Sequence, residues 1–212
     1  MIADEAGART WLHTLPEYDA LAAERLERLV ALLTAENVRQ NLVSAASLGE
    51  VWRRHIADSA QLLRHVPRET SPWLDLGTGA GFPGLVIASL RPGCEVLLIE
   101  SRARRIDWLE RASEALGLAN VRVIGQPLEH VEARAVRVIS ARAFAPLPKL
   151  LDLSARFSTS ATRWLLPKGQ GAAQELAELT GWVHMFHVEQ SLTDPGGGLI
   201  VGELLSRQGA KR

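Results

Sequence analysis

The chain has 212 residues, of which 47% are hydrophobic, and its 24 Lys and Arg balance its 24 Asp and Glu. This length allows one domain with an appendage or two small domains, with enough apolar residues for a core. A net charge of zero gives no overall field that would indicate a nucleic-acid partner. The single cysteine, Cys94, excludes a disulfide framework and a cysteine metal cluster within the chain.

Targeting and metal signals are missing as well. No apolar run approaches the roughly 20 residues of a membrane-spanning helix, and the acidic Asp4 and Glu5 do not fit a signal peptide. His184 and His187 have no third ligand near them in the sequence, so we expect no metal site. We therefore expect a cytoplasmic monomer that binds neither a membrane nor a metal ion.

The first 66 residues have a helical pattern, with apolar residues repeating along one face over residues 19–35 and again over 48–66. Residues 67–72 then form a linker, which divides the chain into an N-terminal helical extension (1–70) and a main domain (71–212). Residues 37–68 contain five arginines against Glu50 and Asp58. A solvated helix face explains this basic patch as well as RNA binding does. His55 lies at the edge of the apolar stripe, and we favour a hydrogen-bonded core histidine over a functional one.

The main domain alternates strands and helices, which is typical of an α/β fold with a mostly parallel, Rossmann-like sheet. The seven candidate strands are residues 73–76, 95–100, 120–125, 136–141, 162–166, 182–189 and 199–205. The loop between the last two, residues 193–198, is too short for a helix, so these two strands should form an antiparallel hairpin. Ligands bind beyond the carboxyl ends of the strands in such sheets.

The stretch 73–84 runs from an apolar strand into a glycine-rich loop and then into a helix. Gly77, Gly79 and Gly81 let a ligand approach the backbone closely, which is typical of a nucleoside-cofactor site. Gly79-x-Gly81-x-x-Gly84 also fits the dinucleotide fingerprint, so a nicotinamide cofactor stays an alternative. Asp75 favours a cationic ligand such as S-adenosylmethionine, because its carboxylate would repel a pyrophosphate.

Further candidate residues follow the later strands. Glu100 ends the second strand, where a carboxylate binds the ribose hydroxyls of either cofactor or caps the next helix. Arg102, Arg104 and Arg105 crowd the first turn of that helix, against its dipole. A phosphate partner and neutralisation by Glu95, Asp107 and Glu110 explain these arginines equally well.

Three later strand ends complete the pattern. Leu128 and Glu129 follow the third strand, where an adenine would lie. Arg142 and Phe144 follow the fourth strand, and Lys168 follows the fifth. Phe144 fits core packing better than base stacking. Arg142 and Lys168 together predict a positively charged opening to the ligand site.

The chain resembles a known family in several motifs that together span nearly its whole length. These motifs are Asn41-Leu42-Val43-Ser44, Arg54-His55-Ile56-Ala57-Asp58-Ser59, the glycine stretch through Phe82-Pro83-Gly84, Glu100-Ser101, Ser140-Ala141-Arg142-Ala143-Phe144-Ala145 and Lys168-Gly169. The family is that of the small-subunit ribosomal RNA guanine methyltransferases once named glucose-inhibited division protein B. The chain departs from it before Glu129, where Pro127 and Leu128 replace the usual arginine and small residue.

The resemblance implies a class I methyltransferase fold, S-adenosylmethionine as methyl donor, and 7-methylguanine in small-subunit (16S) ribosomal RNA as product. Residues implied or predicted to bind the cofactor are Asp75, Gly77, Thr78, Gly79, Gly81, Phe82, Glu100, Leu128, Glu129 and Arg142. We expect catalytic positioning from Arg142 and Lys168. We expect RNA contacts from Arg39, Arg53, Arg54, His55, Arg102, Arg104, Arg105 and Lys168. The alternatives are a non-catalytic RNA-binding assembly protein and a nicotinamide-dependent oxidoreductase.

Overall fold

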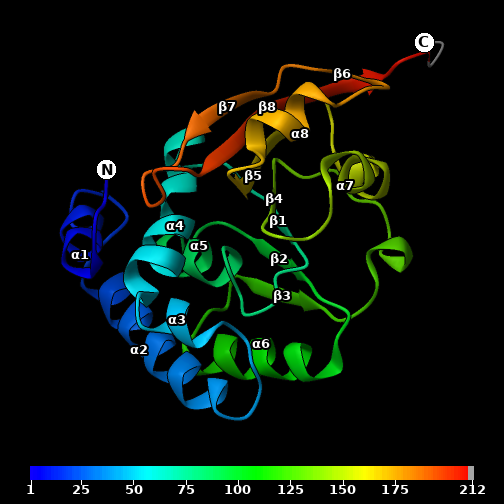
Figure 1. Cartoon of the computed structure of the whole chain (residues 1–212). Helices are drawn as coiled ribbons and strands as arrows, with labels where there is room; N and C mark the ends of the chain where they lie inside the picture. The colour runs from blue at the N-terminus through cyan, green and yellow to red at the C-terminus, as the bar shows by residue number, and fades with distance from the viewer. Residues whose placement is uncertain (210–212) are drawn as a thin grey trace.

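The computed structural model describes residues 1–209 and contains one sheet with helices on both faces (Figure 1). The strands are β1 (Trp73–Leu76), β2 (Val96–Ile99), β3 (Val121–Ile124), β4 (Val138–Ala141), β5 (Arg163–Gly169), β6 (Trp182–His184), β7 (His187–Gln190) and β8 (Gly198–Arg207). Their order is β3-β2-β1-β4-β5-β8-β6, and β7 also pairs with β8. The first five strands are parallel, whereas β8 runs antiparallel to β5, β6 and β7.

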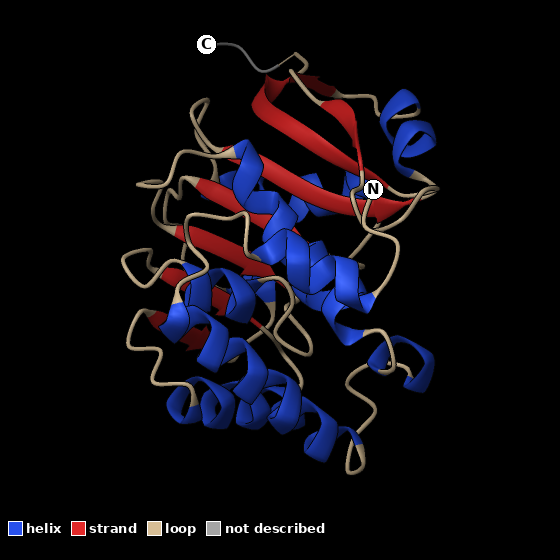
Figure 2. Cartoon of the chain, turned by 90° about the vertical axis from the view of Figure 1, so that its left-hand side faces the viewer, coloured by secondary structure: helices blue, strands red, loops and turns tan. Residues whose placement is uncertain are grey.

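Alternate residues of the central strands face two separate hydrophobic clusters, as a sheet covered on both faces requires. Trp73 and Leu98 belong to the cluster that contains the N-terminal helices, α5 (Gly84–Leu90) and α6 (Ala103–Ala115). Leu74 and Leu97 belong to the cluster that contains α7 (Leu147–Ser154), η4 (Ala155–Phe157), the 3₁₀ turn η3 (Leu128–His130) and α8 (Ala172–Ala177). Figure 2 shows helices in front of the sheet and others behind it.

The N-terminal segment contains α1 (Glu5–Leu12), α2 (Ala20–Asn37), α3 (Ala45–Leu48), the π-helical η1 (Trp52–Ala57), α4 (Asp58–Ala60) and the 3₁₀ turn η2 (Gln61–His65). The helix expected over residues 48–66 is thus three consecutive short pieces, η1, α4 and η2, which follow α3 after a turn. Leu26 and Ile56 from this segment share a cluster with Val86 of α5. The ion pair between Arg91 Nη2 and Glu17 Oε1, 3.0 Å apart, is also buried between the two parts. A domain boundary at residue 70 stays a prediction.

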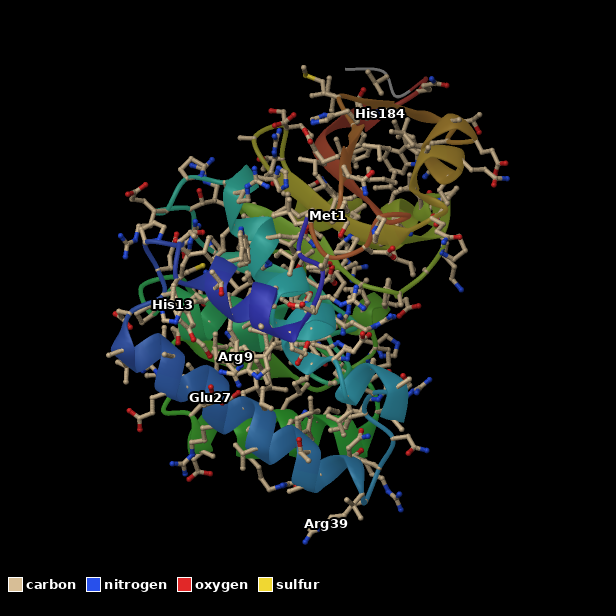
Figure 3. All side chains as sticks on the ribbon, turned by 60° about the vertical axis from the view of Figure 1, so that its left-hand side comes forward. Met1, Arg9, His13, Glu27, Arg39 and His184 are labelled. Atoms are coloured by element: carbon tan, nitrogen blue, oxygen red, sulfur yellow. The ribbon has the colours of Figure 1, made fainter. Side chains whose placement is uncertain are left out.

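Charged side chains also join the first two helices. Figure 3 shows the labelled Arg9 of α1 close to Glu27 of α2, and these two side chains form an ion pair. Asp19 caps α2 by accepting a hydrogen bond from the backbone N–H of Ala22, 2.8 Å away. No helix within the described residues is long and apolar enough to cross a bilayer.

The fold class and the antiparallel hairpin are confirmed, but the expected strand count was wrong. The predicted strand 182–189 is interrupted at Met185 and Phe186, which gives eight strands instead of seven. The interruption faces Gly202 of β8, which lets the two backbones approach closely. A Cβ atom there would lie 2.4 Å from the carbonyl oxygen of Met185. The backbone N–H of Phe186 donates to His184 Nδ1, 3.1 Å away, in place of a strand partner.

Candidate active site

The glycine loop follows β1 at the centre of the sheet. Gly77 has a φ of +59°, and a Cβ atom on it would lie 2.4 Å from Cδ2 of Phe144. Both features require glycine, because other residues adopt positive φ at a cost and none would fit against this ring. The loop is held in place by Trp108, whose indole Nε1 donates to the carbonyl oxygen of Ala80 at 3.0 Å, and by the N–H of the buried Thr78, which donates to the carbonyl oxygen of Ile99 at 3.1 Å.

Asp75 lies beneath this loop and is 0% exposed. Its Oδ2 accepts a hydrogen bond from the Gly84 N–H at 3.1 Å, and its Oδ1 accepts one from Ser140 Oγ at 2.7 Å. Burial raises the pKa of Asp75 to about 6, although its hydrogen bonds act in the opposite direction. The carboxyl group therefore fixes the loop to the start of α5. The structure gives it no open path to a ligand, and its contact with a cofactor stays a prediction.

Glu100 joins the loop to the start of α6 and is also buried. Its Oε2 accepts from the Gly79 N–H at 3.1 Å, and its Oε1 accepts from the N–H groups of Ser101 and Arg102 at 2.8 and 3.0 Å. The helix-capping alternative is not observed, because these N–H groups precede α6, whose first turn has no side-chain cap from the described residues. A ribose contact stays a prediction, supported by the position of Glu100 beside the loop.

The two residues expected beside the adenine differ in environment. Leu128 is buried in the hydrophobic cluster beneath α7, whereas Glu129 is exposed. Arg156 supports this turn by donating to the carbonyl oxygens of Leu128 and, at 3.1 Å, Val131. The side chain of Leu128 thus serves the core, and only Glu129 is free to meet a ligand.

A cavity of about 830 Å³ lies beyond the carboxyl ends of β4 and β5. Its walls come from the N-terminal helices, the loop after β4, the end of β5, helix α8 and the loop between β7 and β8. Polar and aromatic side chains that line it are Ser44, Ser47, Arg53, Arg54, His55, Asp58, Arg142, Phe144, Lys168, Glu175, Ser191, Thr193 and Asp194. Phe144 separates this cavity from the glycine loop, because it lines the cavity and packs on Gly77.

Arg142 lies at the wall of the cavity where the N-terminal helices meet the sheet. Its Nη1 donates to the carbonyl oxygen of Arg54 at 3.2 Å and lies 3.6 Å from Asp58 Oδ2. Its guanidinium carbon lies 5.2 Å from the centre of the Phe82 ring, within cation–π range. Burial lowers the pKa of Arg142, while Asp58 and Asp75 act to raise it. Phe82 itself is buried, so it supports Arg142 from below.

Asp58 was not among the predicted site residues. Its Oδ1 accepts hydrogen bonds from Thr193 Oγ1 at 2.7 Å and from Gln61 Nε2 at 2.8 Å, while Oδ2 faces Arg142. Asp58 thus joins the N-terminal segment, the β7–β8 loop and Arg142. The signal that could have identified it was its place in the motif from Arg54 to Ser59.

His55 was expected to be a hydrogen-bonded core histidine; its buried position is confirmed, but the expected hydrogen bond is absent among the described residues. The residue is 6% exposed and its ring stacks on Phe82, with ring centres 4.9 Å apart. Neither ring nitrogen has a hydrogen-bond partner among residues 1–209. Burial, with help from Arg142 and Arg54, lowers the pKa of His55 to about 3. The imidazole is therefore neutral at pH 7.

Lys168, the second predicted catalytic cation, is not free. Its Nζ donates to the carbonyl oxygen of Ala145 at 2.9 Å and to Glu175 Oε2 at 2.9 Å. The same oxygen of Glu175 accepts the backbone N–H of Leu147 at 2.8 Å. Lys168 therefore holds the loop after β4 in place, and Glu175, which the sequence did not single out, completes this wall of the cavity.

Comparison with known proteins identifies the family. The model of the family described as rRNA small subunit methyltransferase G matches residues 22–195. The chain belongs to this family. It is 59% identical over 203 residues to the ribosomal RNA small subunit methyltransferase G of Erythrobacter litoralis, covering 95% of this chain and 97% of the relative. It is 45% identical to the protein of that name from Zymomonas mobilis, covering 92% and 91%.

Solved structures agree with a methyltransferase fold. A mutant of MtNAS in complex with S-adenosylmethionine superposes with a TM-score of 0.59 at 15% identity, covering 95% of this chain and 78% of that one. An S-adenosylmethionine-dependent methyltransferase from Aquifex aeolicus gives 0.52 at 16% identity, covering 70% and 90%. At such identities the likeness concerns the fold alone. The family confirms the resemblance seen in the sequence and decides against a nicotinamide-dependent oxidoreductase.

In this methyltransferase, the cations predicted to contact RNA fall into two groups. Arg53, Arg54 and His55 line the cavity. Arg53 is occupied there, since it donates to the Thr193 carbonyl oxygen at 3.0 Å and pairs with Glu50 at 2.8 Å. Arg54 is 55% exposed. Their RNA contacts stay predictions.

The second group lies at the start of α6. Arg105 reaches Glu100 at 3.7 Å, whereas Arg102 and Arg104 are exposed and form no ion pair within residues 1–209. Two of the acids expected to neutralise them are paired elsewhere, Glu95 with Arg134 and Asp107 with Arg111. Arg104 instead lines a shallow depression with Arg39, which projects from the lower end of α2 in Figure 3.

Metal chemistry has no candidate ligands here. Among residues 1–209 no group of three or more His, Cys, Asp and Glu side chains is arranged to hold a metal ion.

Proposed function

We propose that the protein transfers a methyl group from S-adenosylmethionine to N7 of a specific guanine in small-subunit (16S) ribosomal RNA, acting in the cytoplasm as a monomer. One observation carries the proposal beyond family membership. A cavity lined by four cations and three acids lies against the glycine loop, and the single ring of Phe144 lies between them. The cofactor loop and the cavity are thus the two halves of one site.

The residues present fit the donor. The loop at Gly77 and Gly79 offers backbone without Cβ atoms, and the Glu100 carboxylate lies at the Gly79 N–H. A carboxylate in this position suits a ribose. Gly77, Thr78, Gly79, Gly81, Phe82, Glu100 and Glu129 would hold the cofactor, with Asp75 and Leu128 supporting the loop and the turn from behind. When bound, S-adenosylmethionine supplies an electrophilic methyl group on a sulfonium.

The cavity suits the acceptor. Its volume of about 830 Å³ is large enough for a nucleotide turned out of its stack. N7 of guanine carries a lone pair and no proton, so the transfer needs no general base. This requirement agrees with His55, which is neutral and buried. Positioning and electrostatics must then supply the rate.

Arg142 is the residue best placed to position the acceptor. Asp58 and the carbonyl oxygen of Arg54 restrain its guanidinium at the cavity wall. It would hold a phosphate or the guanine O6 beside the reacting nitrogen. Arg39, Arg53, Arg54, Arg102, Arg104 and Arg105 would extend the RNA surface over the helical extension (1–70) and the start of α6 in the methyltransferase domain (71–212).

The experiment is transfer of labelled methyl by the purified protein to deproteinised ribosomal RNA and to small subunits, both from a strain that lacks the gene. We expect label in at least one of them, recovered after digestion as 7-methylguanine. Cofactor binding without transfer to either substrate would favour a non-catalytic assembly protein. Label on a different atom or base would also refute the proposal.

A further inference from the structure

The pair Lys168–Glu175 lies in the cavity wall, close to the glycine loop. Phe144 packs on Gly77, and the next residue, Ala145, accepts a hydrogen bond from Lys168 Nζ at 2.9 Å. Nζ in turn reaches Glu175 at 2.9 Å. A base stacked near Phe144 would therefore turn one edge toward this pair.

Glu175 has an uncommitted oxygen. Its Oε2 accepts from both Lys168 Nζ and the Leu147 N–H, whereas Oε1 accepts no hydrogen bond from any residue that the structure describes. The side chain is 32% exposed, against 8% for Lys168. An ionised carboxylate has about four acceptor positions, so Oε1 offers free acceptor capacity to a ligand in the cavity.

The wall formed by the N-terminal helices contains His55, whose polar atoms are enclosed. His55 is more than nine-tenths buried, yet both of its ring nitrogens lack a partner within residues 1–209. Buried polar groups are nearly always hydrogen-bonded in native proteins. The His55 nitrogens are enclosed by protein, so of these two residues only Glu175 offers an accessible acceptor to a ligand in the cavity.

Guanine matches the Lys168–Glu175 pair. Its N1–H and N2-amino groups are donors that lie beside the O6 acceptor, on the edge away from N7. Adenine has the opposite pattern, with an acceptor at N1 and a donor at N6. Enzymes that act on an extruded base read this edge by hydrogen bonds. N7 is present in both purines, so selection of guanine needs a contact of this kind.

We propose that Glu175 selects the target guanine by accepting hydrogen bonds from N1–H and the N2-amino group through Oε1, with Lys168 donating to O6. This inference rests on the proposed function and names the side chains that set its base. Adenine is rejected because its N1 lone pair would face the carboxylate. Glu175 would also hold Lys168 in position from the same wall.

The test compares guanine with inosine, which lacks the N2-amino group. Small subunits are reconstituted with RNA ligated to carry either base at the methylated position, and kcat/KM is measured for each. The wild-type protein is expected to lose roughly 10-fold on inosine, the effect of one base-edge hydrogen bond. Glu175→Gln keeps an amide oxygen for Lys168 and Leu147 but places a donor where Oε1 was. It is expected to lose roughly 10- to 100-fold on guanine and to show no further loss on inosine.

Glu178→Gln is the matched control, because Glu178 is the exposed C-cap residue of α8 and its side chain accepts a hydrogen bond from Gln174 Nε2 at 2.9 Å. It should behave as the wild type does on both substrates. A merely structural role for Glu175 would leave the guanine-to-inosine ratio unchanged in Glu175→Gln, and that result would overturn the proposal. Equal rates on guanine and inosine in the wild type would overturn it as well.

The preference for guanine over inosine can also be measured as a ratio of dissociation constants. Dissociation constants of the two RNAs for wild type and Glu175→Gln give the comparison even if turnover of the variant is too slow to follow. Absence of any wild-type transfer to the guanine substrate would refute the proposed function. Transfer with an unchanged ratio would refute only the role of Glu175.

Discussion

The glycine loop and the cavity are held in place by contacts of different range. Beneath the loop, Asp75 bonds Gly84, nine residues away, and Glu100 bonds Gly79, 21 residues away. Around the cavity, Arg142 bonds a carbonyl oxygen 88 residues away and Asp58 bonds a hydroxyl group 135 residues away. The backbone N–H groups of the loop are therefore held by acids of its own segment, whereas the contacts of Arg142 and Asp58 form only when distant segments have assembled. Changes in the cavity should affect transfer, and changes in the loop should affect cofactor binding.

The largest effect is expected for Arg142→Ala. Removing a charge that is positioned toward the reacting groups typically costs about 100- to 1,000-fold in rate. Single-turnover transfer of labelled methyl should fall by that amount, while the melting temperature changes little. Arg137→Ala is the matched control, since Arg137 is exposed just before the other end of the same strand. Near-native transfer by Arg142→Ala would remove this residue from the mechanism.

Gly77→Ala should mainly affect the cofactor half. The substitution adds a Cβ atom 2.4 Å from the Phe144 ring at a φ of +59°. We expect more than roughly 10-fold weaker binding of S-adenosylmethionine by calorimetry, together with a cost of about 1 kcal/mol in stability from the left-handed backbone.

Gly117→Ala separates these two causes. Gly117 has a φ of +62° but no atom within 4 Å of an added Cβ. This variant should lose the same amount of stability, because its backbone is also left-handed, and should keep its affinity for the cofactor. The double variant Gly77→Ala/Phe144→Ala should regain part of the affinity if the collision matters. Equal cofactor affinity in Gly77→Ala and Gly117→Ala would contradict the close approach at Gly77.

His55 should make the cavity sensitive to acid. Its pKa lies near 3 when folded, below the ordinary value of 6.5. The unfolded chain thus binds a proton that the folded chain excludes, and His55 by itself should lower the unfolding free energy by about 1.4 kcal/mol for each pH unit below 6.5. The raised pKa of Asp75 acts in the opposite direction below pH 6. The effect of His55 is therefore read as the difference in denaturation midpoints between wild type and His55→Phe, which keeps the ring stack and should lose less stability on acidification from pH 6.5 to 4.5. His187→Phe, on an exposed strand, is the control, and identical slopes in wild type and His55→Phe would contradict the burial argument.

The smallest effect is expected for Arg39→Ala, outside both halves of the site. If Arg39 contacts one phosphate, RNA affinity should fall a few-fold, and the slope of log K against log salt should decrease by about 1. Arg122→Ala is the control, because the residue paired with Arg122, Leu97, faces the other side of the sheet from the N-terminal helices. An unchanged slope for Arg39→Ala would show that this part of the surface does not contact RNA.

The contrast between short-range and long-range contacts also explains what the sequence could predict. The strand 73–76, the loop glycines and the position of Glu100 follow from local spacing, and the structure has them where expected. The role of Asp58 depends on partners far along the chain, Thr193 and Arg142, and that of Glu175 depends partly on the Leu147 N–H, 28 residues away. No local pattern marks such pairs. The break at Met185 was missed for the same reason, since it faces Gly202 on another strand.

The most direct test is a nucleotide-resolution map of 7-methylguanine in small-subunit ribosomal RNA from four strains: wild type, deletion, and the deletion complemented with wild-type protein or with Arg142→Ala. We predict that one guanine loses its N7 methyl group in the deletion, regains it with the wild-type protein and does not regain it with Arg142→Ala. An identical map in wild type and deletion would contradict the proposed reaction. Full recovery with Arg142→Ala would contradict the assignment of the cavity as the acceptor half of the site.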